Sequence, residues 1–138
     1  MAVDIVKSDP HAGGKSANNR FTNPYNPKAD RTARVRAYWQ VNCATCHVNA
    51  GGGNSQMILS HHLKLDVTKT LGAEPVHTRF GLGENARIIT PGDPAHSVML
   101  QRIIRPAPSR MPPIGATAPD PIWIQLLTEW IAEQKPTK

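Results

Sequence analysis

The sequence predicts an all-α fold in which a few helices are joined by long irregular loops. Two segments, one after residue 30 and one after residue 120, combine a helix N-cap signal with apolar residues at helical spacing. The 13 prolines and 10 glycines among 138 residues indicate extensive loops. Only 39% of the residues are hydrophobic and 5% are aromatic, so we expect a group that is not protein to complete the core.

The chain has the length of one domain with a tail. Residues 1–29 contain prolines and glycines with Ser and Asn between them and show no hydrophobic period, which is typical of a flexible linker. We therefore expect a linker or tail over residues 1–29 and one folded domain over residues 30–138. We expect the isolated domain to be monomeric.

The first helix is expected from Asp30, a good N-cap residue, to about Asn42. Val35, Tyr38, Trp39 and Asn42 fall on one face at helical spacing. This face is expected to pack on the rest of the domain.

Two Asp-Pro pairs mark the other main helices. Asp93-Pro94 places a proline at the first helical position after an N-cap and predicts a helix to about Ile104. Asp120-Pro121 repeats the signal and predicts the last helix, to about Gln134. Its apolar stripe consists of Trp123, Leu127, Trp130 and Ile131.

The remaining segments are predicted to be mostly irregular. We expect a short helix over residues 55–62 and extended pieces at residues 63–67 and 87–90. Residues 105–121 contain six prolines in 17 positions, which excludes a helix there.

The net charge of +6 favours acidic partners. The basic residues Arg31, Arg34 and Arg36 predict a surface that docks an acidic partner. No Lys/Arg run is interleaved with aromatic residues, so we expect no nucleic-acid binding. No segment has the apolar length of a membrane span, and residues 1–20 lack the apolar core of a signal peptide, so any leader is absent from this chain.

The strongest chemical signal is Cys43-Ala44-Thr45-Cys46-His47, a C-x-x-C-H motif. In this motif two thiols add across the two vinyl groups of a porphyrin, and the next residue supplies an imidazole to the iron. We therefore expect one covalent haem c, held by Cys43 and Cys46, with His47 as an axial ligand through Nε2. Its Nδ1 should donate to a backbone carbonyl.

Three other interpretations of the two cysteines remain open. They could form a structural disulfide, a thioredoxin-like dithiol or half of a zinc site. A zinc site needs further ligands at paired spacing, and a thioredoxin-like site needs a βαβ context. The sequence offers neither, and both cysteines of the chain lie in the motif.

Met111 is expected to be the second axial ligand of the iron, presented by a loop that Pro112 and Pro113 stiffen. A thioether is a weak ligand that raises the reduction potential, so its loop has to be rigid. The alternatives are that Met111 fills a gap in the core, or that His61 or His62 binds the iron instead. Met99 is expected in the core, Met57 is awkwardly placed for the opposite haem face, and His96 is expected to cap its helix or be exposed.

These residues resemble the class I cytochrome c family. Cys43, Cys46, His47 and Met111 match its haem-binding residues, and Trp39 matches the aromatic residue of its N-terminal helix. Leu127 and Trp130 match the apolar pair of the C-terminal helix that packs across it. Two positions depart from the family. Val35 replaces a small Gly, and no Pro follows His47 at the usual distance, which leaves the carbonyl acceptor for the His47 ring unassigned.

A closer resemblance covers about residues 36–134 and is carried by the segments 38–47, 91–97, 110–115 and 129–131. It is to monohaem domains that are often appended to larger exported bacterial proteins. The resemblance implies a class I cytochrome c fold, with the N- and C-terminal helices packed around haem, and an electron carrier rather than an enzyme. It implies a periplasmic or secreted location and an exported redox partner, such as a quinoprotein dehydrogenase or a copper polysaccharide monooxygenase. The alternative function is a haem enzyme or ligand sensor with an open or bis-His sixth site.

Overall fold

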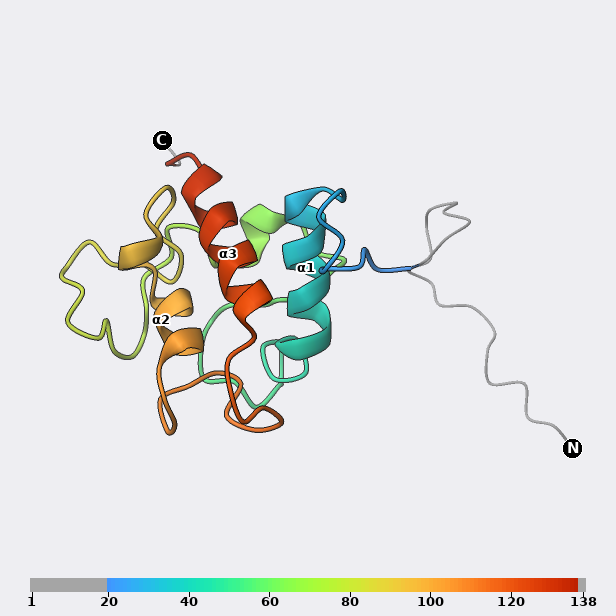
Figure 1. Cartoon of the computed structure of the whole chain (residues 1–138). Coiled ribbons are helices and arrows are strands. Elements are labelled where there is room, and N and C mark those ends of the chain that lie inside the picture. The colour runs from blue at the N-terminus through green and yellow to red at the C-terminus, as the bar shows by residue number, and fades with distance from the viewer. Residues whose placement is uncertain (1–19, 137–138) are drawn as a thin grey trace, which may run out of the picture.

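The structure, a computed structural model, describes residues 20–136, and its regular elements are all helical (Figure 1). The α-helices are α1 (Arg31–Asn42), α2 (Val98–Ile104) and α3 (Pro121–Glu133), and the short 3₁₀ helices are η1 (Leu65–Val67) and η2 (Pro94–His96). The described residues contain no β-strand, only isolated bridges that join Leu71 to Ile89 and Arg87 to Ser97. The prediction of an all-α chain with long loops is therefore confirmed.

Helices α1 and α3 begin where the sequence predicts. The Asp30 carboxylate accepts a hydrogen bond from the Ala33 N–H at 2.8 Å and caps α1. The Asp120 carboxylate accepts from the N–H groups of Ile122 and Trp123 and caps α3, with Pro121 at the first helical position. Both ends satisfy N–H groups that the helix itself leaves without a partner.

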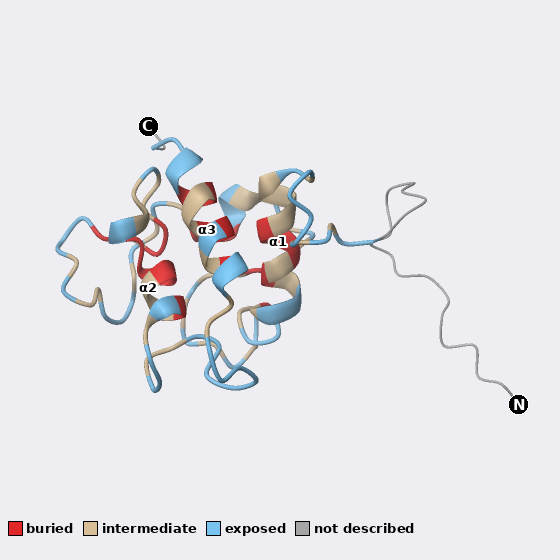
Figure 2. Ribbon diagram, viewed as in Figure 1, coloured by how far each residue is buried: buried red, intermediate tan, exposed pale blue. Residues whose placement is uncertain are grey.

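The two long helices pack against each other and supply half of the buried residues of the core cluster. In Figure 2 their facing sides carry the buried residues, and the outer sides are exposed. The Trp39 and Trp130 rings meet edge to face, with their centroids 5.5 Å apart. Such an aromatic pair contributes about 0.5–1.5 kcal/mol beyond the burial of its area. The fully buried residues of this interface include Val35, Trp39, Leu127, Trp130 and Ile131.

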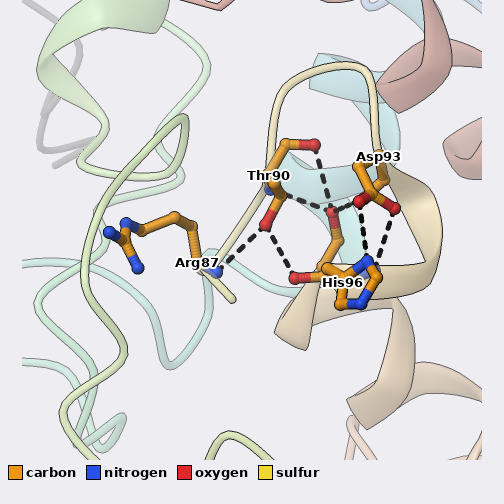
Figure 3. A network of polar contacts seen from close by, with 5 residues as sticks. Arg87, Thr90, Asp93 and His96 are labelled. Atoms are coloured by element: carbon orange, nitrogen blue, oxygen red, sulfur yellow. Dashed lines mark hydrogen bonds and ion pairs between the residues drawn. The ribbon is translucent and has the colours of Figure 1, made fainter. Parts of the chain in front are cut away.

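The helix predicted from Asp93 to Ile104 is divided into η2 and α2 at Ser97. Ser97 is fully buried and has extended backbone angles, with φ −96° and ψ 113°. Its hydroxyl accepts from the Thr90 N–H and donates to the Asp93 carbonyl, both at 2.9 Å. These bonds to the preceding loop replace helical ones, so the helix stops and restarts. Figure 3 shows the same loop, with the Thr90 hydroxyl donating to the His96 carbonyl.

The short helix predicted over residues 55–62 is absent, which corrects that expectation. The Leu59 N–H donates to the His47 carbonyl at 2.8 Å and the Ile58 N–H to the Thr68 carbonyl at 2.9 Å. The His61 N–H donates to the Gln40 side chain at 2.7 Å. These long-range acceptors take the donors that a helix would use, and the pattern of apolar residues alone could not reveal this.

The other irregular segments largely agree with the sequence. Residues 105–120 contain no helix, as their prolines predict. In the segment 87–90, which is expected to be extended, Arg87 and Ile89 each form an isolated parallel bridge. The segment 63–67, expected to be extended, instead contains η1.

Part of the expected tail lies against the helices. The Tyr25 hydroxyl donates to the Asp120 carboxylate at 2.7 Å, and the Arg34 guanidinium donates to the Pro24 carbonyl at 2.8 Å. The Phe21 ring meets the His61 ring edge to face, with centroids 4.8 Å apart. Residues 20–29 thus connect α1, the loop after it and the start of α3. The rest of the expected tail, residues 1–19, lies outside the described residues.

Candidate functional site

The C-x-x-C-H motif forms a compact turn at the end of α1. The Cys43 and Ala44 N–H groups both donate to the Trp39 carbonyl, at 2.9 and 2.8 Å. The Cys46 and His47 N–H groups both donate to the Cys43 carbonyl, at 3.1 and 2.9 Å. The two thiols and the imidazole therefore project from a single hydrogen-bonded turn that follows α1 and is bonded to the carbonyl of the buried Trp39.

The two thiols are free and differ in their surroundings. Cys43 is partly buried and Cys46 is exposed. Burial, followed by the proximity of Cys46, raises the pKa of the Cys43 thiol to about 12. The Cys43 thiol is therefore protonated at neutral pH and lies on the inner side of the turn, while Cys46 faces solvent.

One nitrogen of the His47 ring is buried and forms no hydrogen bond within residues 20–136. Among the described residues, the Nδ1 atom of its ring is buried and has no hydrogen-bond partner. Burial lowers the pKa of His47, which favours the neutral imidazole that binds metals. The expectation that His47 Nδ1 donates to a backbone carbonyl is therefore wrong for residues 20–136, because this atom has no hydrogen-bond partner among them.

A glycine loop packs directly on this turn. A Cβ atom at Gly53 would lie 2.8 Å from His47 Nδ1, and one at Gly51 would lie 2.3 Å from the Cys46 carbonyl oxygen. Real Cβ atoms essentially never approach so closely, whereas a Cβ at Gly52 would meet nothing within 4 Å. The Gly53 N–H also donates to the Cys46 carbonyl at 3.0 Å. The loop therefore forms a cradle that only glycine fits at two of three positions.

Trp39 connects the Cys43–His47 turn to the core. Its side chain is fully buried against Trp130, and its carbonyl accepts the two N–H groups that start the Cys43–His47 turn. Its indole Nε1 is buried without a partner among the described residues. Trp39 therefore ties the position of the motif to the packing of α1 on α3.

Met111 and Pro112 lie in an exposed loop fixed to α2. The Met111 N–H donates to the Arg102 carbonyl at 2.8 Å. The Arg110 guanidinium donates to the carbonyls of Ala116 and Thr117, at 2.7 and 3.2 Å, and closes the loop after Met111. The Met111 side chain is 36% exposed, and Pro112 is exposed. The described contacts thus attach Met111 to α2 rather than to the Cys43–His47 turn.

Two other methionines and two histidines have structural contacts in the described residues. Met99 is buried in α2, as predicted, and Met57 is partly buried against the core. His96 is exposed, and its Nδ1 lies 2.6 Å from the Asp93 carboxylate (Figure 3). The His61 ring packs on Phe21, and burial, Arg36 and His62 lower its pKa.

The predicted basic docking surface at Arg31, Arg34 and Arg36 is wrong. Arg31 forms ion pairs with Glu129 and Glu133 on α3. Arg34 donates to a backbone carbonyl, and Arg36 is only 6% exposed. The Arg36 guanidinium donates to three carbonyls of the loop over residues 60–63. The sequence could not distinguish these interior contacts from a solvated face.

Other residues near the Met111 loop were missed by the sequence analysis. The guanidinium carbons of Arg102 and Arg105 lie 4.7 and 4.2 Å from the centroid of the Phe80 ring. The run of three glycines at residues 51–53, so soon after the motif, is a sequence signal for the close packing of Gly53 on His47. No sequence pattern links Phe80 to α2.

Comparisons with family models, curated proteins and solved structures gave no significant match. Within residues 20–136, no helix is long and apolar enough to cross a membrane.

Proposed function

We propose that this chain is a monohaem c-type cytochrome domain that transfers single electrons. The observation that carries the proposal is the Cys43–His47 turn, in which two free thiols and a neutral imidazole project from one hydrogen-bonded segment. The donor set fits haem c, because two thiols can form thioethers and an imidazole is a common haem-iron ligand.

The loop that carries Met111 also suits a large apolar group. Met111, Pro112, Pro113 and Ile114 are all exposed, and Ile114 is 80% exposed. Arg102 and Arg110 hold this loop in place. An apolar cofactor that covers part of the loop would explain why its apolar side chains are exposed in a run. This supports a class I cytochrome c arrangement, in which the α1–α3 pair and the Met111 loop enclose the haem.

Each residue has a distinct task in this proposal. Cys43 and Cys46 hold the cofactor covalently, and His47 binds the iron through Nε2 while Gly53 fixes its ring. Met111 supplies the second axial ligand, and Pro112 stiffens its loop. A bound haem supplies a one-electron couple between Fe(II) and Fe(III), whose potential a thioether raises. The protein itself catalyses no bond chemistry.

The proposed setting is outside the cytoplasm. A covalent haem implies maturation in an exported compartment, so we place the domain in the periplasm or in a secreted protein. Its partner would be an exported redox enzyme, such as a quinoprotein dehydrogenase or a copper polysaccharide monooxygenase. Both statements rest on the resemblance of the motif segments to appended monohaem domains.

The ferric absorption spectrum separates electron transfer from catalysis at the iron. With His47 and Met111 both bound, the ferric protein should be low-spin, show the weak red band of methionine–iron(III), and titrate reversibly with one electron. A high-spin ferric spectrum that changes on adding cyanide or peroxide would instead indicate a haem enzyme or sensor. A low-spin spectrum without the red band would point to His61 or His62 as the ligand.

A further inference from the structure

We propose that the domain docks acidic protein surfaces through the face formed by Arg102, Arg105, Phe80 and the Met111 loop, residues 105–120. This inference rests on the proposed function, because it identifies where a partner exchanges electrons with the haem. The face differs from the basic surface at Arg31, Arg34 and Arg36 that the sequence predicted.

The first support is positive charge without nearby carboxylates. In the part of the chain that the structure describes, no Asp or Glu lies within ion-pair distance of Arg102, Arg105 or Arg110. All of these arginines are partly exposed. By contrast, Arg79 and Arg87 share Glu74. Charge that the domain leaves uncompensated favours the approach of a negative surface.

The second support is that these side chains are held in place. The guanidinium groups of Arg102 and Arg105 both lie over the Phe80 ring, at 4.7 and 4.2 Å from its centroid. The Arg102 guanidinium also donates to the Ser109 carbonyl at 3.2 Å. Within residues 20–136 no hydrogen bond engages the Arg105 guanidinium; its Nε is buried, so the two terminal nitrogens are the donors that remain for a partner's carboxylate. Preorganised arginines lose less entropy when they bind.

The third support is the direct connection to the proposed iron ligand. The Arg102 carbonyl accepts the Met111 N–H at 2.8 Å, so the arginines and the thioether belong to one fixed unit. In Figure 1 the loop after α2 and the end of α1 lie toward the same, lower side of the molecule. The exposed Ile114 adds apolar area, and arginine with apolar residues is a common composition of protein interfaces.

Oxidation of the reduced protein by charged metal complexes tests this face without a known partner. Each reaction moves one electron from the domain to the complex, either the anion hexacyanoferrate(III) or the cation tris(phenanthroline)cobalt(III). Arg105→Glu should slow the anion reaction at low salt by a factor on the order of five, because a two-unit charge change acts at roughly 10 Å. It should accelerate the cation reaction. Arg105→Gln should give about half of each effect on a logarithmic scale, and salt should remove both.

Lys28→Glu is the matched control, because it makes the same charge change on an exposed residue just before α1. Its rates with both complexes should match those of the parent protein. Poly-glutamate added at low salt should occupy the face as an acidic polypeptide and slow the anion reaction of the parent protein. It should not change the rate of the anion reaction of Arg105→Glu.

The mass of each variant is measured first to establish whether it carries covalent haem. This measurement distinguishes a failure of the docking face from a failure of the proposed function. Equal effects of Arg105→Glu and Lys28→Glu in haem-loaded proteins would overturn the docking face and leave the proposed function intact. Competition by poly-glutamate that persists in Arg105→Glu would also overturn it. Absence of haem from every protein would overturn the proposed function and the docking face together.

Discussion

The His47 imidazole is positioned by backbone packing rather than by a hydrogen bond. Its Nδ1 is buried without a partner among residues 20–136, and the Gly53 backbone lies against it. An imidazole that donates no hydrogen bond is a less basic ligand, which favours Fe(II) and a higher potential. The thioether of Met111, the proposed second ligand, would act in the same direction.

Alanine at Gly53 should disturb the iron ligand, whereas alanine at Gly52 should not. A Cβ at Gly53 meets the His47 ring at 2.8 Å, and one at Gly52 meets nothing within 4 Å. None of Gly51, Gly52 and Gly53 has a positive φ, so the contact alone decides the cost. We expect Gly53→Ala to shift the reduction potential and the ferric electron paramagnetic resonance spectrum. Identical values for the two variants would show that the cradle does not position His47.

Leucine at Met111 should remove the second ligand without a large change of volume. We expect Met111→Leu to lose the red methionine–iron(III) band and to lower the potential, because the thioether stabilises Fe(II). Met99→Leu and Met57→Leu are matched controls that should retain both, since volume-conserving changes cost less than about 1.5 kcal/mol. A parent-like spectrum of Met111→Leu would assign the ligand to a histidine, and a Met57→Leu variant that loses the band would assign it to Met57.

At the scale of elements, Asp120 connects three parts of the chain. It caps α3, accepts the Tyr25 hydroxyl from the segment before α1, and lies 3.5 Å from the Tyr38 hydroxyl. The Tyr38 ring stacks on Trp123 with their planes 5° apart. One carboxylate therefore fixes the start of α3 against α1 and against residues 20–29.

The two tyrosines of the chain should report this contact as the pH rises. The hydrogen bond to Asp120 raises the pKa of Tyr25, and burial, followed by Asp120, raises the pKa of Tyr38 above the ordinary value of 10.0. The neutral hydroxyls are favoured in the folded state, so their stabilisation is present below pH 10.0 and is lost as the pH rises toward the raised pKa values.

Asp120→Asn should lower the pKa of Tyr25 more than that of Tyr38. Asparagine retains one oxygen to cap α3 but removes the charge, and the amide nitrogen that replaces the other oxygen cannot accept the Tyr25 hydroxyl hydrogen bond. Tyr38 stays raised because burial is its main cause. Phenolate absorbance of Tyr25→Phe and Tyr38→Phe, each with and without Asp120→Asn, measures the two pKa values. An unchanged Tyr25 pKa would contradict the contact.

The sequence predicts elements whose signals are local. Asp30 and Asp120 lie at the N-caps of α1 and α3, and the apolar stripe of α3 is buried. On the predicted face of α1, Val35 and Trp39 are buried, whereas Tyr38 is partly buried and Asn42 is exposed. The predictions of helices that fail concern segments whose backbone hydrogen bonds go to residues elsewhere in the chain. Ser97 divides a predicted helix because it bonds to Thr90, and the helix at residues 55–62 is absent because its donors reach other loops. The same reason removes Arg36 from the surface.

In the candidate site too, local sequence signals are predictable and contacts between distant residues are not. The turn at Cys43–His47 is contained in five consecutive residues, so its chemistry is visible in the sequence. The three glycines after the motif are visible in the sequence, but the contact of Gly53 with His47 and the pairing of Phe80 with Arg102 and Arg105 depend on folding. The assignment of Met111 to the iron remains a prediction.

At the scale of the whole molecule, the three α-helices of residues 20–136 form a small frame that fixes the Cys43–His47 turn and the Met111 loop, the two segments that would hold the proposed haem. The α1–α3 pair fixes the Cys43–His47 turn through Trp39, and α2 fixes the Met111 loop through the Arg102 carbonyl. The loops that carry these groups bury few apolar side chains of their own. A covalently bound haem would complete this frame, as the low aromatic content of the chain implies.

The central claim is tested most directly by the intact mass of the chain after expression with the cytochrome maturation machinery. Under denaturing and reducing conditions, the account predicts the mass of the chain plus one haem. Cys43→Ala and Cys46→Ala should each weaken attachment, and the double variant should lose it. A parent chain with the mass of the polypeptide alone, or a double variant that retains covalent haem, would contradict the account.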